Sequence, residues 1–464
     1  MTFAPVRRFG CLTAVLATAL WVCPPALAIT RPQVDPGAPP PNGAPGPVQP
    51  MEKNGECTVT GAVAGTDFST STPSQRMLDP SAAWRFSRGD GQLVAVLDTG
   101  VRPGPRLPGV QAGGDYVEST DGLTDCDGRG TAVAGLIAGQ PGDDGFAGIA
   151  PAARLVSLRV ASAKFSPRTP GGDPALARAA VDVAALSRAI VHAADLGARV
   201  IAISTTTCLP ADRNVDQKEL GAAIRYAAVD KDAVIVAAAG NSGATGSATS
   251  GAACESNPLT DLGLPDDPRN WAGVTSVSVP SWWQPYVLSV GSLTPDDQPS
   301  KFTMAGPWVG IAAPGENIVS VSNRDDGGLA NGIPNEHQQL VPLIGSGYAA
   351  GYVAGVTALV RSKYPNLNAT QVIHRITATA HNGARAPSNV VGAGTVDPVA
   401  ALTWELPAAA NNDASPVKHV AAPPEPAPKS RVPLIVAFGG TAALIGAVVA
   451  SAAIAARRRK ESTL

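Results

Sequence analysis

The sequence predicts an α/β protein with a mainly parallel sheet flanked by helices, plus one transmembrane helix near the C-terminus. Continuous apolar runs, typical of strands buried on both faces, alternate with segments of helical spacing through the middle of the chain. This alternation predicts a parallel sheet with helices on both faces. An uncharged run of 25 residues, 432–456, is long enough to cross about 30 Å of hydrocarbon.

The predicted strands are short apolar runs, at 93–97, 155–160, 200–204 and 233–238. The predicted helices lie at 130–138, 181–196, 217–230 and 348–363. Polar side chains follow two of the strands: Asp98 comes directly after the first, and Asn241 lies in the turn after the last. Because sites in such sheets collect at the carboxyl ends of the strands, these two residues are candidates for a functional site. Segments 162–175 and 323–340 are predicted to be mobile surface loops.

The two ends of the chain carry targeting signals. Residues 1–28 resemble a cleaved signal peptide, with Arg7 and Arg8, the apolar run 11–22 and the small residues around Ala28. An uncleaved signal anchor is the alternative, but the apolar run is too short to span a membrane. The run 432–456 is followed by four basic residues, which place the tail 457–464 in the cytoplasm and the bulk of the chain outside. A buried core helix is the alternative for 432–456.

The prolines mark the boundaries of the predicted domain. A Pro-rich extension covers residues 29–82, a globular domain covers 83–404, and a Pro-rich linker covers 405–431. The formal net charge is only -2, so we predict no nucleic-acid-binding surface.

Four cysteines remain outside the signal peptide: Cys57, Cys126, Cys208 and Cys254. An even count outside the cytoplasm indicates disulfides, with three possible connectivities. We favour Cys57–Cys126, which would join the extension to the domain, and Cys208–Cys254, which would close a Gly/Ser/Thr-rich loop. A metal site is the alternative. No histidine or cysteine stands at ligand spacing from these residues, so we predict no metal and no cofactor.

Several motifs occur in the order found in one protease family. Val94-Ala-Val-Leu-Asp98, Asp127-Gly-Arg-Gly-Thr131, the segment from Ala237 to Asn241 and the segment from Gly345 to Lys363 resemble the aspartate, histidine, oxyanion-hole and serine motifs of subtilisin-like proteases, the subtilases or S8 peptidases. Downstream segments 306–317 and 394–398 also match typical family segments, and the resemblance extends over about 83–402.

The architecture narrows this resemblance to the mycosins. A signal peptide, a Pro-rich extension with a cysteine, a subtilase domain, a Pro-rich stalk and one transmembrane helix are similar to these membrane-anchored subtilases of type VII secretion systems. The segment 121–127 is especially similar. The resemblance implies a membrane-anchored extracytoplasmic domain and, as partners, the subunits of a type VII secretion membrane complex.

The resemblance assigns roles to four positions. Asp98 is the triad aspartate and Asn241 is the oxyanion donor. Arg129 stands at the histidine position and Gly347 at the serine position. Arginine has no acceptor lone pair and stays protonated, so it cannot act as a general base. Glycine has no nucleophile.

The sequence therefore predicts a pseudoprotease that acts in complex assembly or holds an extended peptide in its cleft. The alternatives are an active endopeptidase that uses non-standard residues and a surface binding module unrelated to secretion. Ser346 is one residue from the serine position, which on a helix turns its side chain by about 100°. His337, in a predicted loop, is the one histidine that could reach the site.

A buried carboxylate at Asp98 needs a partner. We predict that Arg129 forms a bidentate ion pair with it, the alternative being an Arg129 side chain that points to solvent.

Overall fold

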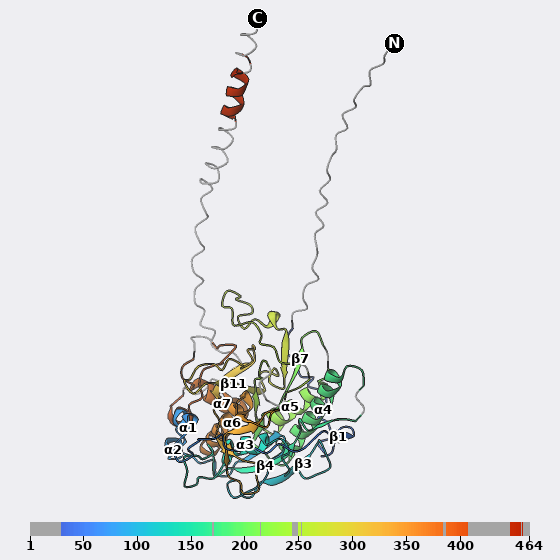
Figure 1. Ribbon diagram of the computed structural model, residues 1–464, viewed down its shortest axis with the longest axis vertical. Coiled ribbons are helices and arrows are strands. Elements are labelled where there is room, and N and C mark those ends of the chain that lie inside the picture. Colours follow the sequence, from blue (N-terminus) through green and yellow to red (C-terminus); the bar gives the residue numbers. More distant parts are fainter. Residues whose placement is uncertain are drawn as a thin grey trace. The chain divides into compact units, whose positions relative to one another are not determined.

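A seven-stranded parallel sheet runs through the fold (Figure 1). The structure is a computed structural model, and it describes residues 29–168, 171–213, 215–243, 249–251, 253–383, 387–406, 446–455 and 457. The strand order is β12-β11-β8-β6-β2-β4-β3, and every neighbouring pair is parallel. The strands are β2 (Leu93–Asp98), β3 (Gln111–Asp115), β4 (Arg154–Arg159), β6 (Val200–Ile203), β8 (Val234–Ala238), β11 (Val287–Leu293) and β12 (Val309–Pro314). The predicted fold class is confirmed for this part of the chain.

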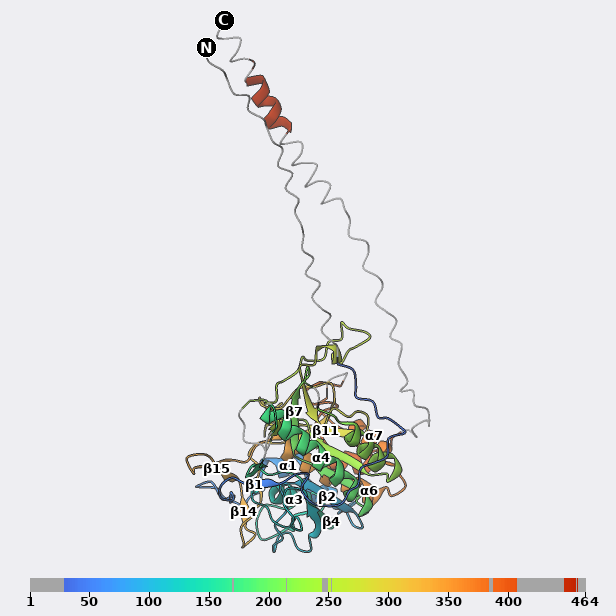
Figure 2. The same ribbon diagram turned by 90° about the vertical axis from the view of Figure 1, so that its right-hand side faces the viewer.

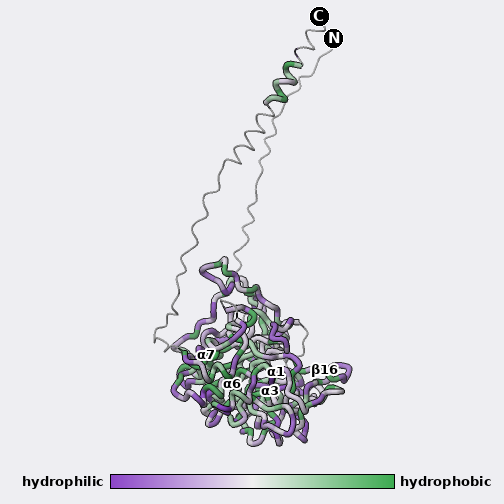
Figure 3. Tube along the Cα trace, turned by 90° about the vertical axis from the view of Figure 1, so that its left-hand side faces the viewer, coloured by the Kyte–Doolittle hydropathy of each residue, from purple (hydrophilic) through white to green (hydrophobic). Residues whose placement is uncertain are grey.

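Each face of the sheet is covered by helices, as the buried apolar strands require. In β2, Val94 and Val96 pack into one core, and Ala95 and Leu97 pack into the other. The first core is closed by α1 (Pro73–Leu78), α2 (Pro80–Ala83), α3 (Arg129–Ala138), α6 (Ser346–Lys363), α7 (Ala369–Ala378) and α8 (Pro398–Thr403). The second is closed by α4 (Pro174–Asp195) and α5 (Lys218–Arg225), which continues as a π-helical turn over Tyr226–Asp230. Figure 2 shows the molecule from the side of α4, and Figure 3 shows it from the opposite side, that of α1, α6 and α7.

Helices α3 and α6 approach each other closely at glycines. A Cβ atom at Gly351 would lie 3.2 Å from Cγ1 of Val133, and one at Gly355 would lie 3.4 Å from the carbonyl oxygen of Ile137, both in α3. The absence of a side chain at Gly351 therefore allows the two helices to pack closely. Both helices begin earlier than the sequence predicted, at Arg129 and Ser346, because each preceding glycine has a positive φ and forms the N-cap.

The prediction of loops at 162–175 and 323–340 was wrong in part, because both segments contain strands. β5 (Phe165–Pro167) pairs with β1 (Met51–Lys53) of the N-terminal extension. The second segment contains β14 (Leu329–Ala330) and β15 (Gly332–Pro334). These pair with β13 (Ser320–Val321) and β16 (Leu340–Pro342). The partner of β5 is far away in the sequence, so local composition could not predict the pairing.

The N-terminal extension lies along the domain from α4 to β15. The hydroxyl of Tyr116 donates to the carbonyl of Gly43 at 2.7 Å. Further along the chain, the N–H of Gly61 donates to the carbonyl of Gly332 at 2.9 Å. A separate three-stranded sheet contains β7 (Thr206–Pro210), β9 (Thr249–Gly251) and β10 (Ser276–Val279).

The predicted targeting segments fall mostly outside the described residues. Residues 1–28 and most of 432–456 are among those not described. The chain divides into two compact units, Met1–Pro407 and Ala408–Leu464, and in the second a helix is described over 446–455. Within the described parts of the chain, no helix has both the length and the apolar character needed to cross a membrane.

Candidate functional site

Asp98 forms the centre of the site, at the carboxyl end of β2. Its carboxylate is fully buried. Oδ1 accepts a hydrogen bond from the N–H of Thr99 at 2.7 Å and one from Nε of Arg129 at 3.0 Å. Oδ2 accepts a hydrogen bond from the hydroxyl of Ser204, which follows β6 directly. The carboxylate is thus held by three donors, which is the condition under which a buried charge is tolerated.

Arg129 meets Asp98 as the sequence predicted, but with a different geometry. Its side chain is 7% exposed, so it does not point to solvent. The pair is made through Nε alone, and the predicted bidentate contact is absent. Thr99 and Ser204 already donate to the two carboxylate oxygens, which leaves room for one guanidinium contact. Nη2 of Arg129 is buried and has no partner among the described residues.

Asp125 anchors the turn that opens α3, and sequence reasoning missed it. Oδ1 accepts from the hydroxyl of Thr99 and from the N–H of Gly128, both at 2.8 Å. Oδ2 accepts from the N–H and the hydroxyl of Thr131, at 2.8 and 2.7 Å. Burial raises the pKa of Asp125 to about 6, although hydrogen bonds from Thr131 and Thr99 oppose the rise. The sequence feature that could have identified Asp125 is an acidic residue just before the start of a helix.

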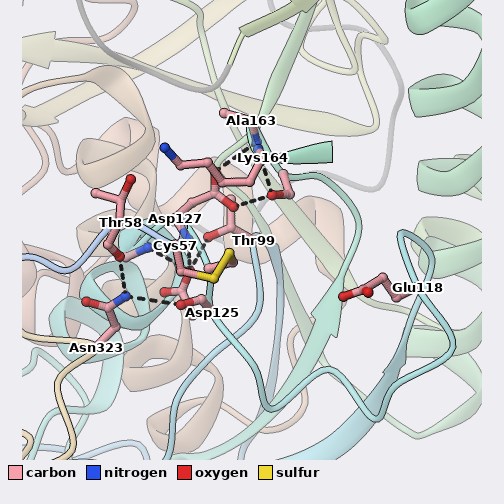
Figure 4. Close-up of a disulfide and its surroundings, with 12 residues drawn as sticks. Cys57, Thr58, Thr99, Glu118, Asp125, Asp127, Ala163, Lys164 and Asn323 are labelled. Carbon is pink, nitrogen blue, oxygen red and sulfur yellow. Dashed lines mark hydrogen bonds between the residues drawn. A yellow bond between two sulfur atoms is a disulfide. The ribbon is translucent and has the colours of Figure 1, made fainter. Parts of the chain in front are cut away.

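The N-terminal extension supports this turn from outside (Figure 4). Cys57 forms a disulfide with Cys126, as we favoured from the sequence. The side-chain amide of Asn323 donates to the carbonyls of Thr58 and Asp125, at 2.8 and 3.0 Å, so it connects the two stretches. The second favoured disulfide, Cys208–Cys254, also forms, and it joins β7 to the segment after β9.

Gly347 lies in the first turn of α6, next to Ser204. A Cβ atom built on Gly347 would lie 2.7 Å from the carbonyl oxygen of Ser204 and 3.3 Å from its Cβ. Because Ser204 also donates to Asp98, it is the residue that joins the Gly347 turn to the Asp98–Arg129 pair. Sequence reasoning did not identify this role of Ser204.

Ser346 does not take the place of a nucleophile. It is buried, and its hydroxyl accepts a hydrogen bond from the N–H of Gly240 at 3.1 Å. Its own N–H donates to Oδ1 of Asn241 at 2.9 Å, which places Asn241 against the start of α6. His337 is exposed in the connection between β15 and β16, and no described contact joins it to Asp98 or Gly347.

The arrangement brings the predicted residues together but, among the residues described, contains no base–nucleophile pair. Asp98, Arg129 and Gly347 meet around Ser204, and Asn241 lies at the adjacent turn. Arg129 can donate hydrogen bonds and carries a positive charge, but it cannot accept a proton. Among the described residues, no group of histidine, cysteine and carboxylate side chains is placed to hold a metal ion.

Comparison with known proteins connects this geometry to a family. The family described as Subtilase family matches residues 89–394. Mycosin-3 of Mycobacterium tuberculosis is 69% identical over 455 residues, which cover 97% of this chain and 98% of that protein. Mycosin-1 of Mycolicibacterium smegmatis is 42% identical over 98% of this chain and 100% of its own length.

Solved structures agree in fold. The MycP3 protease from the type VII (ESX-3) secretion system is 66% identical, with a TM-score of 0.78, and covers 81% of this chain and 100% of its own. A chain in an intact ESX-5 inner membrane complex is 46% identical, with a TM-score of 0.78, over 92% of this chain and 100% of its own.

Proposed function

This chain belongs to the mycosins of the subtilase family, and from that premise we propose that it is a pseudoprotease. It keeps the subtilase fold and serves in a type VII secretion complex without cleaving peptides. One observation carries the proposal: the guanidinium of Arg129 occupies the partner position of the buried Asp98. A subtilase needs a proton acceptor at this place. An arginine there stays protonated at any ordinary pH and has no lone pair to offer.

The serine position supports the same proposal. Gly347 has no nucleophile, and Ser346 is engaged with Gly240. In subtilisin, loss of the serine or the histidine alone costs about 10⁶ in kcat, and the two losses are not additive. That corresponds to about 8 kcal/mol of transition-state stabilisation. Asn241, the oxyanion donor of the family pattern, would then act only as a hydrogen-bond donor to a bound peptide.

The proposed place of the protein is a type VII secretion membrane complex. A relative of this chain has been solved within the ESX-5 inner membrane complex, and related chains occur in its periplasmic assembly. We assign to this chain a cleaved signal peptide over 1–28, an extension over 29–82 and a subtilase domain over 83–404. A linker over 405–431, a single transmembrane helix over 432–456 and a cytoplasmic tail over 457–464 complete the proposed topology. The domain then lies outside the cytoplasm, held at the membrane.

The direct test of inactivity is labelling with a fluorophosphonate, which reacts with activated serines. The full chain, solubilised in detergent, should show no labelling under conditions in which an active subtilisin is labelled completely. The variant Ser346→Ala is the matched control, because it removes the serine nearest to the altered position. Labelling of the parent chain that disappears in Ser346→Ala would establish the alternative, an active endopeptidase that uses non-standard residues.

Membership of the complex is tested by affinity purification of the tagged full chain from solubilised membranes. We expect the channel subunits of a type VII system to be recovered with it. Recovery of the chain without these subunits would favour the third hypothesis, a surface binding module unrelated to secretion.

A further inference from the structure

We propose that the altered centre binds the C-terminal carboxylate of a polypeptide, which Arg129 and the N-terminus of α6 recognise together. This inference rests on the proposed function, since a centre that cleaved peptides would release such a product. The inference adds the class of ligand, which is a polypeptide whose C-terminus lies in the altered centre.

The first argument is the unused hydrogen-bonding capacity of Arg129. The guanidinium carries five N–H donors, and the described structure gives it one acceptor, Oδ1 of Asp98. Nη2 is buried without a partner among the described residues, in a side chain that is 7% exposed. A buried charged donor without an acceptor is unfavourable by about 1–3 kcal/mol or more. Such an orphan donor in a native site calls for an explanation, and an unbound ligand is one.

The second argument is the start of α6, an 18-residue helix whose N-terminus has no side-chain cap and no acidic residue in its first turn. The N–H of Ser346 is taken by Oδ1 of Asn241, and the N–H of Tyr348 donates to the carbonyl of Gly345 at 3.2 Å. No acceptor for the N–H of Gly347 is found among the described residues. An uncapped helix start of this kind favours a negatively charged oxygen.

Arg129 and the start of α6 belong to one site. Ser204 donates to the same carboxylate that Arg129 contacts, and its carbonyl lies against Gly347. Burial raises the pKa of Tyr348, in the first turn of α6, above its usual value, and the charge of Arg129 opposes this rise. The guanidinium is therefore within electrostatic range of the first turn of α6.

The acidic residues nearby do not supply the missing partner. Asp98 accepts from Thr99, Ser204 and Arg129. Asp125 accepts from two hydroxyls and from three backbone N–H groups. Both carboxylates are satisfied by their own donors, whereas a donor is left over. The ligand that completes the site is an acceptor, and negative charge on it pairs with the cation.

A C-terminal carboxylate fits this requirement better than an internal peptide bond. In a subtilase cleft, the carbonyl under attack lies between the oxyanion donor and the serine position. A chain that ends there presents two oxygens and a full charge in place of one neutral carbonyl. One oxygen can accept from the start of α6 and the other from Arg129, as in charge-assisted pairs elsewhere.

The test compares two peptide mixtures on the same immobilised full chain. Both are N-acetylated pentapeptides with four randomised positions followed by alanine. One mixture ends in a free carboxylate and the other in an amide. Peptides retained at equilibrium are counted by mass spectrometry. We expect the free acids to be retained about 10- to 100-fold more strongly, the range for a hydrogen bond to a charged group. Equal retention of the two mixtures, or retention of neither, would overturn the proposal.

Two lysine variants assign the effect to Arg129. Arg129→Lys keeps the charge and can still pair with Asp98, but its single ammonium leaves no planar second donor for a ligand. Its preference for free acids should fall to within about threefold of unity. Arg102→Lys is the matched control, because the Arg102 side chain is about half exposed and pairs with Asp325, while its backbone N–H donates to Thr131 of α3. It should keep the full preference, and loss of the preference in Arg102→Lys alone would contradict the assignment.

The outcomes separate this inference from the proposed function. Absence of a carboxylate preference, together with absence of fluorophosphonate labelling, would leave a pseudoprotease with no carboxylate site. Fluorophosphonate labelling of the chain would contradict the proposed function itself, whichever peptides are retained.

Discussion

The turn that opens α3 and the turn that opens α6 meet at the same buried carboxylate, and they meet it in different ways. At α3, the long charged side chain of Arg129 reaches Asp98 and pairs with it. That turn is also held by Asp125, by the Cys57–Cys126 disulfide and by Asn323. At α6, Gly347 has no side chain, and the carbonyl oxygen of Ser204 lies 2.7 Å from the position that a Cβ atom would take.

The difference shows two ways in which a site can depart from a catalytic pattern. A substitution that introduces a buried charge needs a compensating partner, and the stability of the fold comes to depend on it. A substitution that removes a side chain introduces no charge, so it needs no such partner. The α3 turn should therefore be sensitive to changes at its new residue, whereas the α6 turn should resist the return of a side chain.

The largest effect is expected from Arg129→Met. This change leaves the carboxylate of Asp98 buried without its cation, which costs about 3–5 kcal/mol of folding stability. Denaturant unfolding of the domain, followed by circular dichroism, measures the loss. Arg102→Met is the control, since its exposed pair with Asp325 should contribute about 0–1 kcal/mol. A loss below about 1 kcal/mol for Arg129→Met would show that the ion pair does not support the fold.

The next effect concerns pH and the Asp125 anchor. The pKa of Asp125 is about 6 in the folded chain, raised by burial from its ordinary value of 3.8. Below about pH 4 the group is protonated in both the folded and the unfolded chain, and its favourable contribution is complete. Between about pH 4 and 6 the folded chain binds more protons, so stability falls as pH rises, by up to about 3 kcal/mol.

Asp125→Asn removes this titration. The difference in unfolding free energy between the parent and the variant should therefore change between about pH 4 and 6.5 and stay constant above about pH 7. A difference that does not depend on pH would mean that Asp125 titrates normally. The matched control is Asp121→Asn, because Asp121 is an exposed acid in the same turn region.

The smallest effect is expected from Gly347→Ser. The new Cβ would lie 2.7 Å from the Ser204 carbonyl, so the start of α6 must shift, at a cost of about 1–2 kcal/mol. The variant should remain unlabelled by a fluorophosphonate, because Arg129 still supplies no base. Activity in this single variant would contradict the α3 half of the comparison, because Arg129 would then not prevent catalysis. Fluorophosphonate labelling that appears only when Arg129→His is combined with Gly347→Ser would agree with the comparison.

Much of this site follows from residue types and their order. The apolar run before Asp98 places a carboxylate at a strand end, and Arg129 was expected to be its partner because a buried acid requires one. The loop predictions failed where a strand finds its partner far along the chain, as β5 does with β1. The bidentate geometry failed because Ser204, a residue of another strand end, already donates to the carboxylate.

The sequence by itself determined the fold class and the residue types at positions 98, 129, 241 and 347, since lone pairs and nucleophiles belong to side chains. Only the tertiary structure decided which donors share Asp98, how Asp125 and the extension hold the α3 turn, and how closely the Ser204 carbonyl approaches Gly347. Those features depend on distances between segments that are far apart in the chain. Packing sets these distances, and no local pattern encodes them.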